Sequence, residues 1–126
     1  MKNSFAGLSV LLVEDEYLIA LDAEQILKNL EFANVEMAAT WDCAVKQARV
    51  GRFDIAVLDV NINGQLSFPI ADVIAQRGIP VVFASGYDLR QRVNSEFDGV
   101  CVTKPYTSER LKEALSVALA RAADGK

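Results

Sequence analysis

Five short apolar runs alternate with longer segments of helical period, and this alternation limits the folds open to the chain. The apolar runs are predicted as strands at residues 8–13, 35–38, 54–60, 80–85 and 99–103. Runs without a polar residue at every second position are typical of strands covered on both faces, as in parallel sheets. The sequence therefore predicts an α/β fold, with a doubly wound five-stranded parallel sheet and helices on both faces.

The segments between the runs predict five helices. In the first helix one stripe is predicted to be apolar and buried: Leu18, Ile19, Ala23, Ile26, Leu27 and Leu30. The last helix has a similar stripe: Leu111, Ala114, Leu115, Ala118, Leu119 and Ala122. The fourth helix is predicted around Leu89, Val93 and Phe97. Helix boundaries are indicated by N-cap threonines, by glycines that end helices and by an early proline: Thr40, Thr107, Gly51, Gly78 and Pro69.

Length and composition exclude several classes of protein. With 126 residues we expect one domain over 1–126, a core of about 7–122 and no output domain. The net charge of −4, with scattered Lys and Arg, argues against nucleic-acid binding. Because the chain has no histidine, it cannot use a Ser-His-Asp or Cys-His pair.

The expected location is the cytoplasm. The two cysteines form no CxxC pair, which fits a reducing compartment. The apolar N-terminal run imitates a secretion signal, but three acids stand where small cleavage-site residues are needed. No apolar run approaches the ~18 residues of a membrane span, so we expect no membrane partner.

Chemistry-bearing residues stand at the carboxyl ends of the predicted strands, where ligands bind in such folds. Glu14 and Asp15 follow the first strand, Asp59 the third, Ser85 the fourth and Lys104 the fifth. A sparse set of carboxylates favours Mg²⁺, which keeps several of its waters. A carboxylate such as that of Asp59 can also attack a phosphoryl group, with Lys104 neutralising charge and the Ser85 hydroxyl donating a hydrogen bond.

This set of residues, which covers nearly the whole chain, resembles the CheY-like receiver domain of two-component response regulators. The resemblance implies a flavodoxin-like strand order 2-1-3-4-5 and makes Asp59 the phosphoacceptor, with Lys104 and Ser85 assisting. It also implies that Asp15 and Asp59 bind Mg²⁺ by side chain, Glu14 through water and Asn61 through its backbone carbonyl. The bond between Lys104 and Pro105 is expected in cis.

The chain departs from the common receiver pattern three residues before the lysine. Most receivers carry Tyr or Phe there, whereas this chain has Cys101. The stretch PVVFASGY, which ends at Tyr87, and the loop DVNING without Met-Pro are similar to the FATGUY subgroup. We therefore do not expect phosphorylation to be coupled to the movement of an aromatic residue at this position. Tyr87 or the fourth helix is the candidate for the part of the chain that responds to phosphorylation.

The predicted function is that of a stand-alone response regulator receiver. Asp59 is expected to accept a phosphoryl group from a sensor histidine kinase, with the HWE type as one candidate, or from a phosphotransfer protein. The phosphorylated form then switches binding to a downstream protein, and we expect no enzymatic activity beyond self-phosphorylation and autodephosphorylation. A phosphate sink, a phosphorelay intermediate and a non-phosphorylated interaction module remain as alternatives. A phosphatase of the haloacid dehalogenase type would need a second acid where this chain has Asn61.

Overall fold

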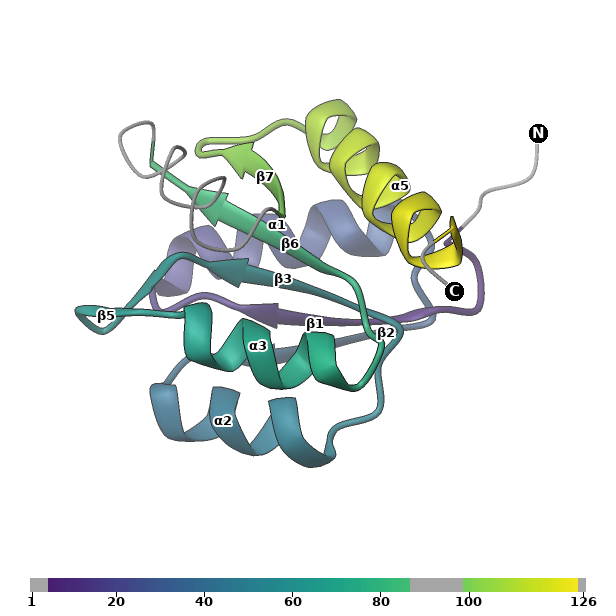
Figure 1. Cartoon of the computed structure of the whole chain (residues 1–126). Helices are drawn as coiled ribbons and strands as arrows, with labels where there is room; N and C mark the ends of the chain where they lie inside the picture. Colours follow the sequence, from purple (N-terminus) through teal and green to yellow (C-terminus); the bar gives the residue numbers. More distant parts are fainter. Residues whose placement is uncertain (1–4, 87–98, 125–126) are drawn as a thin grey trace.

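A five-stranded parallel sheet lies between two layers of helices in the computed structural model, which describes residues 5–86 and 99–124 (Figure 1). Its strands are β1 (Ser9–Val13), β2 (Asn34–Ala38), β3 (Ile55–Asp59), β6 (Val81–Ser85) and β7 (Val100–Thr103). They are ordered β2-β1-β3-β6-β7. Because β6 and β7 are the fourth and fifth predicted strands, the predicted order 2-1-3-4-5 is confirmed.

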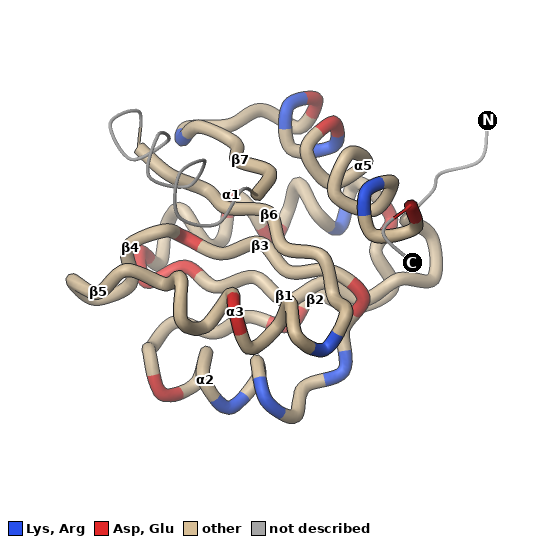
Figure 2. The backbone as a smooth tube through the Cα atoms, in the orientation of Figure 1, with Lys and Arg blue, Asp and Glu red and all other residues tan. Residues whose placement is uncertain are grey.

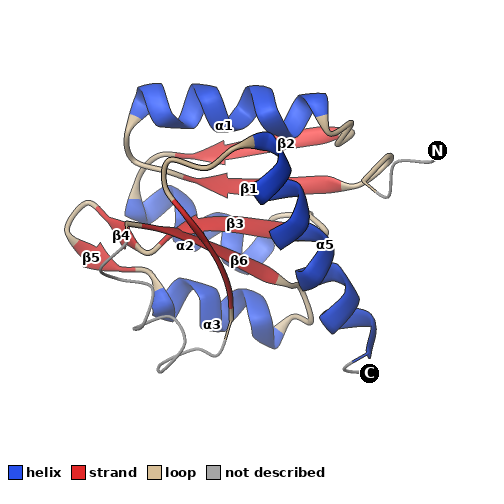
Figure 3. Cartoon of the chain, turned by 90° about the horizontal axis from the view of Figure 1, so that it is seen from above, coloured by secondary structure: helices blue, strands red, loops and turns tan. Residues whose placement is uncertain are grey.

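Helices cover both faces of the sheet, as predicted (Figure 3). One layer holds α1 (Tyr17–Asn29) and α5 (Ser108–Asp124), and the other holds α2 (Trp41–Val50) and α3 (Phe68–Gln76). The helix predicted around Leu89, Val93 and Phe97 lies outside the described residues. None of the helices in the described part of the chain is long and apolar enough to cross a bilayer.

Two apolar clusters fill the space between the sheet and the helices. Since successive strand residues point to opposite faces, β1 contributes Val10 and Leu12 to the cluster under α1 and α5, and Leu11 and Val13 to the cluster under α2 and α3. The residues of β3 and β6 are all buried, whereas the edge strands β2 and β7 are partly exposed. The longest unbroken apolar runs of the sequence thus correspond to strands in the centre of the sheet, and the edge strands have one side open to solvent.

The predicted helix boundaries agree with the structure. The Thr40 hydroxyl accepts a hydrogen bond from the Cys43 amide at 3.2 Å and so caps α2, and Thr107 accepts one from Arg110 at 3.2 Å in the first turn of α5. Gly51 is the C-cap of α2. The first turn of α3 contains Pro69, and Gly78 follows this helix with a φ of 79°.

The predicted apolar stripe of α1 is wrong at Leu18, which is 75% exposed. The buried face of this helix instead carries Ala20, Ala23 and Leu27. Leu18 stands two positions before Ala20, and two positions are about 200° of rotation around an α-helix. Leu18 therefore points to solvent when the two alanines lie on the sheet.

A short hairpin follows β3, where the sequence analysis places only a loop. It pairs β4 (Asn61–Ile62) with β5 (Gln65–Leu66) in antiparallel register. The two turn residues, Asn63 and Gly64, have φ values of 51° and 85°. An Asn-Gly pair with positive φ at both positions is the preferred two-residue turn of a hairpin. The hairpin projects at the end of the sheet that holds the site described below (Figure 1).

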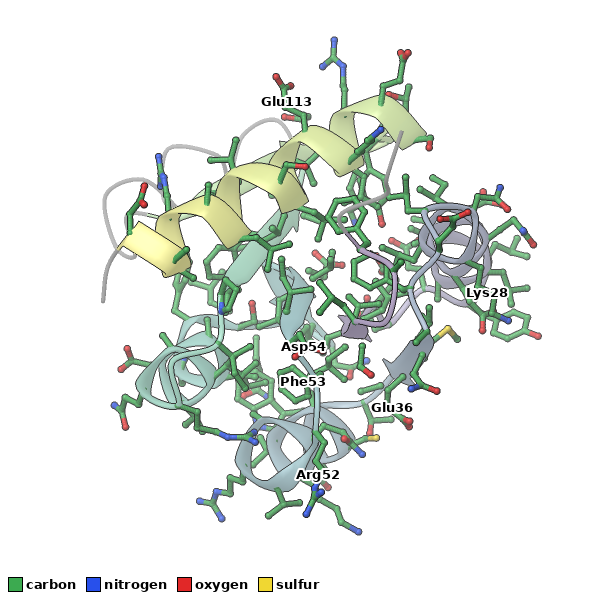
Figure 4. All side chains as sticks on the ribbon, turned by 90° about the vertical axis from the view of Figure 1, so that its right-hand side faces the viewer. Lys28, Glu36, Arg52, Phe53, Asp54 and Glu113 are labelled. Atoms are coloured by element: carbon green, nitrogen blue, oxygen red, sulfur yellow. The ribbon has the colours of Figure 1, made fainter. Side chains whose placement is uncertain are left out.

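The opposite end of the sheet is closed by polar contacts around Phe53 and Asp54, which precede β3 (Figure 4). The Asp54 carboxylate accepts a hydrogen bond from the Ser9 amide at 2.8 Å. The Arg77 guanidinium lies 5.4 Å from the centre of the Phe53 ring and donates to the carbonyls of Ala48 and Gly51. The Arg77 contacts thus fasten the end of α3 to the end of α2, and the Asp54 contact links β1 to the start of β3.

Candidate phosphoacceptor and metal site

Three acids meet at the carboxyl ends of β1 and β3. β1 and β3 are neighbours, and Val13 is in register with Leu58, so that Glu14 and Asp59 follow at the same level. One carboxylate oxygen each from Glu14, Asp15 and Asp59 lies within 4.8 Å of the other two. The predicted convergence of these acids is therefore found in the structure, and Figure 2 shows acidic positions close together around β4 and the end of β3.

Lys104 stands between two of these acids. Its Nζ atom lies 3.0 Å from Oδ2 of Asp59 and 3.2 Å from Oε1 of Glu14. Burial by itself lowers the pKa of this ammonium, but the hydrogen bond to Asp59 and the charges of both acids outweigh it and raise the pKa above 10.5. Lys104 is thus a fixed positive charge in contact with the candidate acceptor.

Glu14 is a buried carboxylate, only 3% exposed, and its oxygens have two different partners. Oε1 contacts Lys104, and Oε2 accepts a hydrogen bond from the Glu16 amide at 3.1 Å. Burial and then the charge of Asp59 raise the pKa of Glu14 from 4.5 to about 7, against the opposing effects of the Glu16 amide and Lys104. A proton or a cation at this site therefore relieves the repulsion between the two carboxylates.

The backbone after β3 holds the other carboxylate oxygens in place. The Asn61 amide donates to Oδ1 of Asp59 at 3.3 Å, and the Asn63 amide donates to Oδ2 of Asp15 at 2.8 Å. The side chain of Asn61 accepts from the Gly64 amide at 3.0 Å, which stabilises the β4–β5 turn. The hairpin thus positions two of the acids. The metal contact predicted for the Asn61 carbonyl stays a prediction.

Ser67 is a site residue that the sequence analysis missed. It is fully buried, and its hydroxyl donates to the backbone carbonyl of Asp59 at 2.6 Å. Its own amide donates to the carbonyl of Val60 at 2.7 Å, so the end of β5 is fastened to the end of β3. A serine just before a predicted helix is the signal available in the sequence, but that position is equally typical of an N-cap.

Ser85 ends β6 and is fully buried. Its hydroxyl oxygen lies 3.3 Å from the sulfur of Cys101 in β7. The peptide bond between Lys104 and Pro105 is cis, as expected. Tyr87, the other candidate for a readout, lies outside the described residues.

A mainly apolar cavity of about 260 Å³ opens beside the acidic site, between α1 and the loop that follows β7. It is lined by Ile19, Asp22, Ala23, Ile26, Lys104, Pro105 and Tyr106. The Tyr106 hydroxyl is buried without a hydrogen-bond partner among the described residues. Burial, and next the charge of Glu14, raises the pKa of Tyr106, so this hydroxyl stays protonated.

The three acids fit a hard divalent cation. Carboxylate oxygens are the ligands that Mg²⁺ prefers, and this ion commonly binds through one or two protein carboxylates while keeping waters. Asp15 is half-buried and its neighbour Glu16 is exposed, so the cluster is open to solvent on one side. The donor set of Glu14, Asp15 and Asp59 thus satisfies the requirements of a magnesium pocket.

The chain is similar to a known protein family and to several proteins of known sequence or structure. The sequence model of the response regulator receiver domain matches residues 10–116. The sensory transduction protein LytT of Bacillus cereus is 30% identical over 114 residues, which cover 86% of this chain and 46% of LytT. The chain spans about half the length of the curated relatives it matches.

Two solved structures have comparable folds and higher coverage of this chain. SdrG from Sphingomonas melonis Fr1 has a TM-score of 0.78 and 34% sequence identity, and the match covers 94% of this chain and 99% of SdrG. The anti-anti-sigma factor PhyR from Bartonella quintana has a TM-score of 0.82 and 26% identity, covering 97% of this chain and 51% of PhyR. Both structures thus resemble this chain over nearly its whole length, and not only at the residues of the site.

Proposed function

Because this chain belongs to the family of response regulator receiver domains, we propose that it serves two-component signal transduction by accepting a phosphoryl group on Asp59. The observation that carries the proposal is the 3.0 Å contact between Lys104 and a buried carboxylate at the end of β3. A fixed cation beside a carboxylate nucleophile suits phosphoryl transfer, in which catalysis is mainly positioning and charge stabilisation.

In the proposed reaction an oxygen of Asp59 attacks the phosphorus of a phosphohistidine on a partner. The new oxygen–phosphorus bond forms while the nitrogen–phosphorus bond breaks, and its electron pair stays on the imidazole nitrogen. Lys104 neutralises charge on the transferred oxygens, and the amide of Asn61 and the hydroxyl of Ser67 hold Asp59 in place. Glu14, Asp15 and Asp59 would hold Mg²⁺, which supplies further neutralisation of the phosphoryl charge when bound.

The donor is proposed to be a sensor histidine kinase, with the HWE type as one candidate, or a phosphotransfer protein. An apolar surface for such a partner is available on α1, where Tyr17, Leu18 and Leu21 are 71%, 75% and 37% exposed. Leu18→Ala should slow phosphotransfer from the protein donor and leave phosphorylation by acetyl phosphate unchanged. Equal slowing with both donors would contradict docking at this surface.

The FATGUY assignment is part of the proposal and is supported by Phe83, Ala84, Ser85 and Gly86 and by the cysteine at position 101. The names of LytT and PhyR, a sensory transduction protein and an anti-anti-sigma factor, support a signalling role through protein partners. We propose that phosphorylation switches binding to a downstream protein and that the chain has no other enzymatic activity. The stand-alone arrangement and the cytoplasmic location stay predictions.

The decisive experiment is intact-mass measurement after incubation with acetyl phosphate and Mg²⁺. The wild type should gain one phosphoryl adduct that is lost at alkaline pH, and Asp59→Asn should gain none. Asp72→Asn, at an exposed position of α3, is the matched control and should behave as the wild type does. An adduct on Asp59→Asn would refute the acceptor assignment. Metal binding in the wild type without any adduct, from acetyl phosphate or from a kinase, would favour the non-phosphorylated interaction module.

The fate of the phosphoryl group separates the remaining alternatives. A receiver that switches a partner should keep its adduct long enough to change an interaction. A phosphate sink should instead lose the adduct to water without binding a new protein, and a relay intermediate should pass it to a second histidine protein. Following radiolabelled phosphate from donor to receiver, water or second protein distinguishes the three.

A further inference from the structure

The hydroxyl of Ser85 and the thiol of Cys101 form a contact that is built into the sheet. Oγ and Sγ are 3.3 Å apart, and either group can donate the hydrogen. The register of β6 and β7 pairs Phe83 with Cys101 and Ser85 with Thr103. Ser85 and Cys101 are therefore diagonal neighbours on one face of two adjacent strands, which lie side by side in Figure 1.

This contact lies on the opposite face of the sheet from the Asp59 carboxylate. Phe83 belongs to the cluster under α2 and α3, and Cys101 packs against the same cluster. Val57 belongs to the cluster under α1 and α5. Because strand side chains alternate between faces, Ser85 shares the face of Phe83, and Asp59 shares the face of Val57. In the resting structure the hydroxyl thus points away from the place where a phosphoryl group would form.

The backbone of Ser85 is fastened on both sides. The carbonyl of the preceding residue accepts a hydrogen bond from the Val60 amide at 3.0 Å, and the carbonyl of Ser85 accepts one from the Lys104 amide at 2.8 Å. With the main chain held by both neighbouring segments, rotation about the Cα–Cβ bond is the remaining way for the hydroxyl to approach Asp59. That rotation breaks the contact with Cys101.

We propose that Cys101 is a positioning residue that holds the Ser85 hydroxyl in its resting rotamer until a phosphoryl oxygen on Asp59 replaces the thiol as hydrogen-bond partner. The inference rests on the proposed phosphorylation of Asp59. A buried hydroxyl needs a partner in either rotamer, so the exchange of partners couples the acceptor on β3 to a side chain of the edge strand β7. Cys101 has a specific role in the switch, although no aromatic residue is present at its position.

A double-mutant cycle on the affinity for beryllofluoride with Mg²⁺, an analogue of a phosphoryl group on aspartate, tests this coupling. Cys101→Ala removes the partner of the resting rotamer and should tighten binding about 2- to 12-fold, the range that corresponds to the net free energy of a typical hydrogen bond. The same substitution in a Ser85→Ala background should have no effect. Cys101→Ser, which keeps a hydrogen-bonding group, should retain wild-type affinity, and so should Cys43→Ala, the matched control on α2.

A second readout requires no phosphoryl analogue. NMR coupling constants between Hα and Hβ of Ser85 report its χ1 rotamer, which should be single in the wild type and in Cys101→Ser and averaged in Cys101→Ala. A fixed rotamer in Cys101→Ala, or an equal change in affinity in both Ser85 backgrounds, overturns the positioning role. A wild type that binds no beryllofluoride would instead overturn the proposed function, and the rotamers would still decide whether the resting contact exists.

Discussion

Replacing Glu14 with glutamine should stabilise the metal-free protein at alkaline pH, although Glu14 is part of the candidate metal site. Burial, and next the charge of Asp59, raises the pKa of Glu14 from 4.5 to about 7. The folded protein therefore binds this proton more tightly than the unfolded chain does. A tenfold difference in proton affinity corresponds to about 1.4 kcal/mol, so the ionised carboxylate lowers the free energy of unfolding by about 3 kcal/mol.

The two pKa values of Glu14 define the pH window of this effect. Below a pH of 4.5 the carboxyl group is protonated in both states and costs no stability. As the pH rises from 4.5 through about 7, the folded state loses the advantage of binding the proton, and stability falls. Glutamine does not titrate. In acid, the free energy of unfolding of the wild type and of Glu14→Gln should therefore change with pH in the same way. As the pH rises, the wild type should lose stability relative to Glu14→Gln, and the difference should level off above about pH 8.

Urea unfolding in EDTA, followed by circular dichroism at several pH values, measures the difference. Glu16→Gln is the control, because it removes the same charge from an exposed side chain only two positions along the chain. Mg²⁺ should reverse the order by stabilising the wild type more than Glu14→Gln. A difference between the two proteins that stays constant with pH would refute the assignment of the buried charge to Glu14.

Three further features of the structure can be tested by substitution. Ser67→Ala removes the hydroxyl that donates to the Asp59 carbonyl, so it should lower the free energy of unfolding in urea by about 1–3 kcal/mol. It should also slow phosphorylation by acetyl phosphate, and an unchanged rate would exclude a positioning role for Ser67. Arg77→Ala should cost about 1.5–3 kcal/mol, because its guanidinium donates to two carbonyls at the end of α2, and Arg77→Lys should recover only part of this loss. Leu27→Ala in the core should lower stability by about 2–5 kcal/mol, whereas Leu18→Ala on the solvent side of the same helix should stay within about 0.5 kcal/mol.

The acidic site could be predicted because each of its residues directly follows an apolar run. In a parallel sheet the carboxyl ends of all strands meet at one edge, so the positions of Glu14, Asp59 and Lys104 in the sequence were sufficient to bring them together. The helical face of α1 could not be fixed in the same way. Its pattern holds alanines and leucines on several sides, and contact with the sheet selects the side that carries Ala20 and Ala23.

The role of Ser67 depends on a long-range contact that its local sequence does not reveal. A serine just before a proline-containing first turn predicts an N-cap, yet the Ser67 hydroxyl makes no cap hydrogen bond to α3. The β4–β5 hairpin returns the chain to the end of β3, and there the hydroxyl meets the Asp59 carbonyl. The Asn-Gly turn predicts such a hairpin, so the pair of signals, taken together, would have placed Ser67 near the acceptor.

The contact between Ser85 and Cys101 shows why residue type alone is insufficient at a switch. A cysteine in an apolar strand predicts core packing, and Cys101 does pack against the cluster under α2 and α3. Its contact with a buried hydroxyl follows from the register of β6 and β7, since a shift of one residue would turn the thiol to the other face. The register therefore decides whether this thiol is a packing group or the resting partner of Ser85, and the double-mutant cycle measures that difference directly.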